Sequence, residues 1–298
     1  MTRFPHDQFA KDYLKELLAP LGEVQAPRSV AGEVREIDVW FAPLPQPTVE
    51  PSVLGLLGRM AASPCLMEPF RNAPTPTEIR NCLLKLFELH GELQRQARRD
   101  EERLQEANLP RLWILSPTAS VPLLDGFRAI VDEDNWMRGI YFLGDHLRAA
   151  VVAIHQLPRT DETLWLRILG KGTVQKQAID ELAALPEENL LRANALELLA
   201  NLRLNLEASE NLEEEDRELI MNLSPAYLQW RDETLREGMQ SGIRLMVESM
   251  LEVKFGAIDR ELSQIVEPLM QLEARDRTQL LMQLSREELL ARFGKSTL

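Results

Sequence analysis

The chain has 298 residues, of which 45% are hydrophobic and 27% charged, a composition that suits one large or two modest globular domains. Its net charge of −13 argues against nucleic-acid binding over the whole surface. The longest aliphatic run, Ala149 to Ile154, is too short to span a bilayer, and the polar start MTRFPHDQ lacks the apolar segment of a signal peptide. We therefore expect a cytoplasmic protein that does not enter a membrane.

The charge is distributed unevenly along the chain. Residues 1–160 carry 21 acidic and 18 basic side chains, a net charge of −3. Residues 161–298 carry 26 acidic and 16 basic side chains, a net charge of −10. A polyanion would therefore have to bind the first part of the chain.

The first part of the sequence alternates between predicted helices and strands. Apolar residues at helical spacing predict a helix from Phe9 to Leu21, and the capping box TPTE predicts another that follows Thr75 and continues to about Glu106. Strands are expected at VREIDVWF, RLWILS, GIYFLG and AAVVAIHQL. This order predicts an α+β fold, with helices flanking a mixed sheet over residues 1–160.

Only helices are expected from Asp161 to the end of the chain. A helical region is predicted over residues 161–240, including a helix in SPAYLQWRDETLREGMQ that begins with Ser224 and Pro225. A small helical module is predicted over 241–298, and its last helix follows the capping box SREE. The C-terminal half is thus predicted to be all-helical.

Two carboxylates on the predicted strand VREIDVWF form the candidate site. Because side chains alternate between the two faces of a strand, Glu36 and Asp38 are expected on one face, about 7 Å apart. Lys11 and Lys15 are expected to share the polar face of the preceding helix. A solvated polar face or a structural ion pair would explain the two carboxylates without any chemistry.

Three sequence segments carry most of a resemblance to a known family: SPAYLQWRDETLREGMQSG, ETLWLRILGKGTVQKQAIDEL and MLEVKFGAIDRELSQIVEPLMQL. They resemble bacterial recombination-promoting nucleases and transposase-associated proteins of the Rpn type, which often end in a small helical domain of unknown function. The resemblance covers most of the chain in outline and is most specific in the helical part. It implies a PD-(D/E)XK nuclease fold, also called restriction-endonuclease-like, for residues 1–160.

The chemistry of that fold gives the two carboxylates a role. An Asp on one strand and a Glu or Asp on the next hold Mg²⁺, and a lysine two residues further on stabilises charge. The resemblance implies Asp38 as the main metal ligand and Glu36 as an assisting one. It also implies Mg²⁺-dependent cleavage of DNA, with DNA bound by the N-terminal domain.

The second half of the family motif is not found in the sequence. Between Phe41 and Thr77 the only acidic residues are Glu50 and Glu68, and there is no lysine. Glu68 is set aside because Arg71 follows it at the wrong spacing and Pro69 is expected to interrupt the strand.

The missing lysine leaves two hypotheses open. Lys11 or Lys15 could replace it, provided that one of their ammonium groups lies close to the carboxylate of Asp38. In the first hypothesis the protein is a Mg²⁺-dependent nuclease, active or degenerate. In the alternative it is a non-catalytic interaction or regulatory protein, in which the nuclease fold is a scaffold and the helical half binds a protein partner or a second copy.

Overall fold

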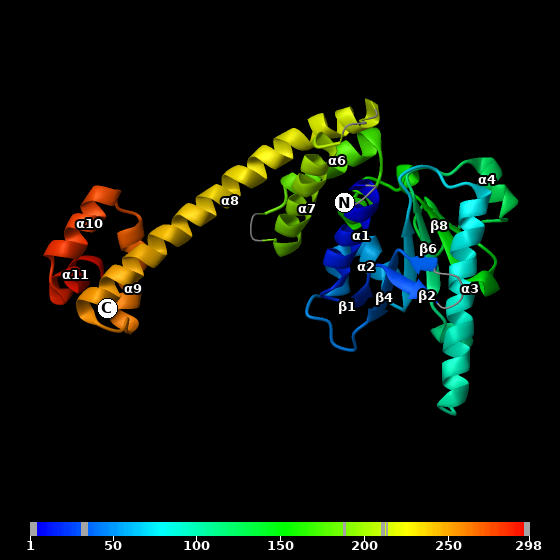
Figure 1. Cartoon of the computed structure of the whole chain (residues 1–298), viewed down its shortest axis with the longest axis horizontal. Helices are drawn as coiled ribbons and strands as arrows, with labels where there is room; N and C mark the ends of the chain where they lie inside the picture. The colour runs from blue at the N-terminus through cyan, green and yellow to red at the C-terminus, as the bar shows by residue number, and fades with distance from the viewer. Residues whose placement is uncertain (1–4, 31–34, 187–188, 210–211, 213, 295–298) are drawn as a thin grey trace. The chain divides into compact units, whose positions relative to one another are not determined.

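The computed structural model describes residues 5–30, 35–186, 189–209, 212 and 214–294. The chain divides into two compact units, Met1–Tyr227 and Leu228–Leu298. The α-helices and strands of the first unit, in chain order (Figure 1), are α1 (Pro5–Leu18), β1 (Gly22–Gln25), β2 (Arg28–Val30), β3 (Arg35–Ile37), β4 (Val39–Pro43), α2 (Gly55–Met60), β5 (Cys65–Pro69), α3 (Pro76–Arg99), β6 (Arg111–Ser116), α4 (Val121–Gly126), β7 (Ile140–Phe142), β8 (Ala149–Ala153), α5 (Leu164–Arg167), α6 (Gly172–Ala183), α7 (Leu190–Glu207) and the start of α8 (Glu214–Phe255). The second unit contains the remainder of α8, then α9 (Arg260–Met270), α10 (Ala274–Gln283) and α11 (Arg286–Phe293).

The first unit is built on a mixed six-stranded sheet with the strand order β1-β4-β5-β6-β8-β7. β1, β4 and β5 are antiparallel neighbours, β5, β6 and β8 run parallel, and β7 is antiparallel to β8. Among the described residues no strand follows β8. The predicted α+β class, a mixed sheet flanked by helices and followed by helices, is therefore confirmed.

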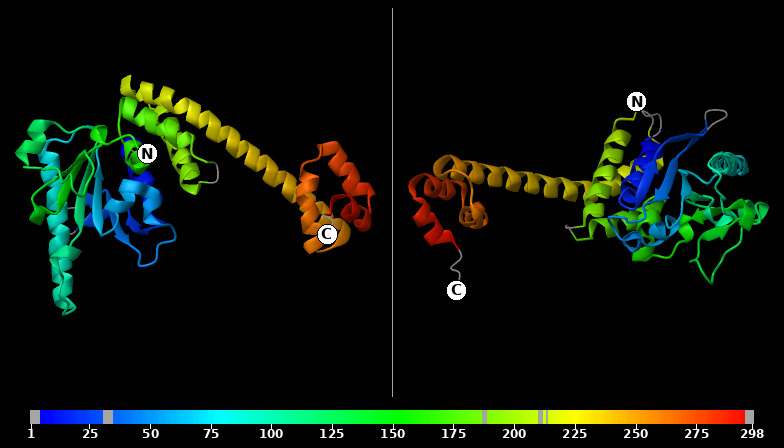
Figure 2. Two further views of the ribbon diagram at one scale, coloured as in Figure 1. Left: turned by 180° about the vertical axis from the view of Figure 1, so that it is seen from behind. Right: turned by 90° about the horizontal axis from the view of Figure 1, so that it is seen from below.

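Helices α1 and α3 cover opposite faces of this sheet (Figures 1 and 2). On the α3 face, Ile79 and Leu86 of α3 pack with Leu66 and Ile114 of the sheet, and all four are fully buried. The capping box at Thr75 is formed, so α3 begins where the sequence predicts, although it ends at Arg99. The central strands β5, β6 and β8 are buried on both faces, which explains their nearly continuous apolar sequences.

The predicted single strand VREIDVWF is in fact two strands that meet at Asp38. β3 pairs with β2 in a separate two-stranded sheet, whereas β4 pairs with β1 and β5. Ile37 and Trp40 lie in the same core cluster, although strict alternation would put them on opposite faces. The prediction of one strand face shared by residues 36 and 38 is therefore wrong, because the backbone bends at Asp38. Val34 lies outside the described residues.

The predicted helix start at Ser224 is also wrong, because α8 runs without a break from Glu214 and contains Pro225 in its interior. A proline inside a helix deprives the carbonyl four residues earlier of its donor. That carbonyl belongs to Met221, an exposed residue, so water can donate the hydrogen bond that the proline cannot. In the second unit, the capping box between Ser285 and Glu288 is formed at the start of α11, as predicted.

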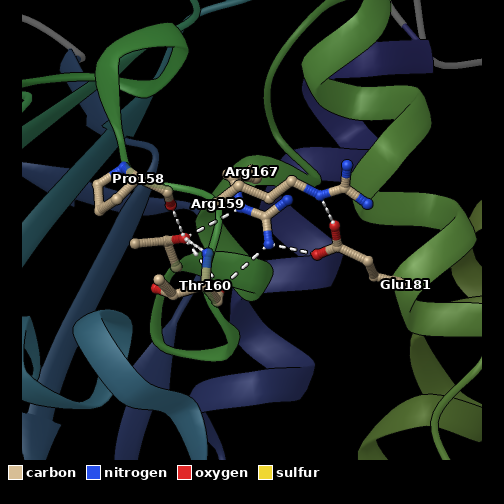
Figure 3. Close-up of polar contacts among 6 residues, drawn as sticks. Pro158, Arg159, Thr160, Arg167 and Glu181 are labelled. Carbon is tan, nitrogen blue, oxygen red and sulfur yellow. Dashed lines mark hydrogen bonds and ion pairs between the residues drawn. The ribbon is translucent and has the colours of Figure 1, made fainter.

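A buried arginine ties α6 to the chain that precedes it (Figure 3). The guanidinium of Arg167 donates hydrogen bonds to the side chain of Thr163 and to the carbonyl of Thr160, both at 3.0 Å. It also pairs with Glu181 of α6, which Arg159 contacts from the exposed side. Because α5 and α6 are joined in this way, the short segment between them is held in place, and part of that segment lines the cavity described below.

The helices that follow the sheet belong to the same compact unit as the sheet itself. α7 packs along α1, and the hydroxyl of Tyr13 on α1 donates a hydrogen bond to the carbonyl of Trp165 at 3.0 Å. In the part of the chain that the structure describes, no helix has the length and apolar character needed to cross a membrane.

Candidate functional site

Asp38 and Glu68 lie next to each other at the end of the sheet where β4 begins and β5 ends. β4 and β5 are antiparallel with Val39 opposite Met67, so the next positions outward are Asp38 and Glu68. The backbone N–H of Asp38 donates to Oε1 of Glu68 with an N···O distance of 3.4 Å. The register of two neighbouring strands thus brings together two carboxylates that the sequence separates by 30 residues.

Two lysines contact this pair, one from the helix on each face of the sheet. Nζ of Lys85, on α3, lies 2.7 Å from Oε2 of Glu68. Nζ of Lys11, on α1, lies 2.9 Å from Oδ1 of Asp38 and also 2.9 Å from Oδ2 of Asp7. The structure therefore places an ammonium group beside each of the two carboxylates.

The electrostatics of the site are dominated by the burial of Glu68, whose side chain is 2% exposed. Burial raises the pKa of Glu68, and the nearby charge of Asp38 raises it further, while Lys85 acts in the opposite direction. Burial disfavours the charge of Lys85, but Glu68 outweighs this effect and raises the pKa of the lysine. For Lys11, burial is likewise outweighed by Asp7 and Asp38, which raise its pKa.

Carboxylate oxygens are the kind of donor that Mg²⁺ prefers. Three carboxylates, those of Asp7, Asp38 and Glu68, face two ammonium groups, so an added cation would reduce the repulsion between the carboxylates. No group of three or more His, Cys, Asp or Glu side chains is arranged to enclose a metal among the described residues. Mg²⁺ is usually held by one or two carboxylates and completed by water and substrate phosphates. Asp38 and Glu68 are the residues that would hold it.

The residues predicted from the sequence fall into two groups. Asp38 and Lys11 come together, which meets the condition for Lys11 as a replacement lysine. Glu36 lies on β3, opposite Ser29 of β2, and is exposed. Lys15 lies one turn beyond Lys11 on α1 and is also exposed. Neither Glu36 nor Lys15 therefore joins Asp38 and Glu68 in the described part of the chain. Both were predicted from one strand face and one helix face, each considered without the rest of the fold.

Sequence reasoning set Glu68 aside and missed Lys85. Pro69 does not interrupt β5 but forms its last residue, opposite Leu115 of β6, and a strand end is a position that tolerates proline. Lys85 is on α3 rather than on the strand, so a search for a lysine two residues after the acid could not find it. The available signal was its position three residues after Cys82, at the edge of the apolar face of a predicted helix.

Asp38 also lines a cavity of about 740 Å³ in the first unit. Side chains from α1, the chain after β5, the segment between α5 and α6, and the start of α8 surround it. Its volume lies within the range of about 300–1,000 Å³ that is usual for small-ligand sites. Its polar and charged lining residues are His6, Asp7, Asp38, Arg71, Asn72, Gln175, Ser209 and Asp216.

Of the two carboxylates, Asp38 lines this cavity, whereas Glu68, whose side chain is 2% exposed, is not one of its lining residues. Comparison with known proteins adds no relative: no protein-family model, no curated protein and no solved structure matches the chain.

Proposed function

We propose that this protein is a Mg²⁺-dependent DNA nuclease of the PD-(D/E)XK type. The observation that carries the proposal is the contact of Asp38, Glu68 and Lys85 at one end of the sheet. An acid on one strand and an acid on the next are the ligand arrangement that the family resemblance implies. In this proposal Glu68 is the second acid, and Lys85 supplies from α3 the charge that the family supplies from a strand.

Each residue of this site has its own role in the proposed cleavage. Asp38 and Glu68 hold the cation, which when bound would polarise a phosphodiester and lower the pKa of an attacking water. Lys85 orients the carboxylate of Glu68 and offers a positive charge to phosphate oxygens as they gain charge. Lys11 orients Asp38 from the other side of the sheet.

The proposal is tested by titrating Mg²⁺ and Mn²⁺ calorimetrically into the wild type and Asp38→Ala, beside a plasmid-nicking assay. We expect Asp38→Ala to lose both the binding heat and the nicking. Glu36→Ala is the matched control, since it removes a carboxylate from an exposed position on β3 in the same part of the chain. It should retain both properties. Wild-type protein that binds no metal, or Asp38→Ala that nicks normally, would contradict the proposal.

A second candidate function, self-association, is favoured by one surface of the second unit. Leu228, Leu235 and Met239 of α8 are 46%, 60% and 69% exposed. They are spaced seven and four residues apart, so they lie on one face of the helix, which is the spacing of a helix that pairs with another. The partner that fits is the same face of a second copy, because the stripe is complementary to itself.

Light scattering after gel filtration tests this second candidate. We expect a concentration-dependent dimer that Leu235→Lys converts to a monomer, because a charge would enter an apolar helix pair. Met282→Lys is the control, since Met282 is an exposed apolar residue of α10. A wild type that remains monomeric at every concentration would exclude self-association through α8.

A further inference from the structure

A carboxylate from the start of α8 contacts a histidine and an arginine in the cavity that Asp38 lines. Oδ1 of Asp216 lies 2.8 Å from Nε2 of His6 and 2.9 Å from a terminal guanidinium nitrogen of Arg71. The side chain of Asp216 is only 14% exposed. The three residues come from α8, α1 and the chain after β5, and all of them line the same cavity as Asp38.

His6 and Arg71 hold this carboxylate as they would hold a phosphate. An arginine guanidinium donates strong, charge-assisted hydrogen bonds to carboxylate and phosphate oxygens alike, and an imidazole N–H can donate to the same oxygen. The partners of Asp216 therefore define an anion subsite, and the anion seen in it belongs to the protein itself.

The position of the subsite relates it to the proposed metal site. Arg71 follows Glu68 by three residues, so their Cα atoms can be at most about 10 Å apart. Asp38, beside Glu68, lines the same cavity as Arg71. A DNA strand with one phosphate at the carboxylate pair would therefore have a neighbouring phosphate within reach of Arg71.

A second cavity adjoins the first at Arg71 and is also lined by a lysine. It has a volume of about 240 Å³ and shares Arg71 and Gln175 with the first cavity. Lys171 also lines it, and its ammonium lies 2.6 Å from Oδ1 of Asn72, a residue that lines the first cavity. Glu218, two residues after Asp216 on α8, is the acidic residue of this lining. The start of α8 thus brings two acidic side chains to the two cavities that Arg71 lines.

We propose that His6 and Arg71 form the subsite for a DNA phosphate next to the scissile one, and that Asp216 is an internal competitor that must leave for DNA to bind. This inference rests on the proposed nuclease function and adds to it a second phosphate contact and an autoinhibitory one. The competitor belongs to a helix outside the sheet, so a movement of the start of α8 would open the subsite.

The test measures DNA binding in EDTA, where neither metal binding nor cleavage contributes. The probe is a fluorescein-labelled DNA duplex with a single-stranded overhang, and its anisotropy is followed at constant salt concentration. We expect Asp216→Asn to bind about tenfold more tightly than the wild type, because a charge-assisted contact no longer competes. Asp125→Asn is the matched control: it removes one exposed negative charge from α4 and should change the affinity little.

The arginine is tested in the Asp216→Asn background. Adding Arg71→Gln should reverse the gain in DNA affinity, and inorganic phosphate should compete with DNA in Asp216→Asn but not in the double variant. Thermal melts establish that each variant is folded, and His6→Gln provides a second, milder change if Arg71→Gln is not. Equal DNA affinity of Asp216→Asn and Asp125→Asn would overturn the subsite. That result leaves the metal site to be judged separately, by the titration of Asp38→Ala.

Discussion

Replacing Glu68 with glutamine is expected to abolish plasmid nicking and to weaken Mg²⁺ binding by about 100-fold or more, because one of two anionic ligands is lost. Glutamine keeps the size of the side chain and an oxygen that can accept from the backbone N–H of Asp38. The matched control is Glu36→Gln, which removes the same charge from an exposed position on β3. We expect this control to bind Mg²⁺ and to nick as the wild type does. If Glu36→Gln has the larger effect, the assignment from the strand register is wrong.

The pH dependence of metal binding gives this prediction a second readout. The pKa of Glu68 is raised by burial and by Asp38, so the folded, metal-free protein binds a proton more tightly than the unfolded chain. The stability that this proton contributes is present at pH values below the ordinary glutamate pKa and is lost as the pH rises through the raised one. Mg²⁺ must displace the proton, so its affinity should increase with pH over the same window.

Calorimetry in buffers of different ionisation enthalpy measures the protons that Mg²⁺ releases. We expect release by the wild type that decreases as the pH rises and is absent in Glu68→Gln. Identical proton release in the two proteins would show that another group titrates with the metal.

Lys85→Met is expected to reduce nicking by about 10²–10³-fold, the usual cost of removing one group that stabilises transition-state charge. Its Mg²⁺ binding should be retained, because lysine is not a metal ligand and its removal frees the carboxylate of Glu68 from a competing cation. Methionine keeps most of the apolar stem of the lysine side chain. The measurements are single-turnover nicking at saturating Mg²⁺ and the Mg²⁺ titration itself.

Two other lysines serve as comparisons for Lys85. Lys15→Met removes an exposed ammonium group from α1. We expect this variant to nick plasmid DNA as the wild type does. Lys11→Met removes the group beside Asp38, 2.9 Å away, and is expected to have the smaller effect of a positioning residue. If Lys11→Met retains metal binding but abolishes nicking while Lys85→Met does not, the catalytic lysine is Lys11.

The sequence by itself determined the elements whose signals are local. The capping box at Thr75 predicts the start of α3 and the apolar run RLWILS predicts β6, since a cap and a buried strand each involve a few neighbouring residues. The α+β class follows from the order of such elements. Asp38 was also singled out from a local pattern, as one of two carboxylates on a predicted strand.

Only the tertiary structure decided which residues accompany Asp38. Glu68 reaches it through the register of β4 with β5, and Lys85 through the packing of α3 on the sheet. Strand register and helix packing depend on contacts among many core side chains that are far apart in the sequence, so no short motif encodes them. The bend at Asp38 has the same origin, since β3 and β4 take different partners, and it is this bend that separates Glu36 from the pair.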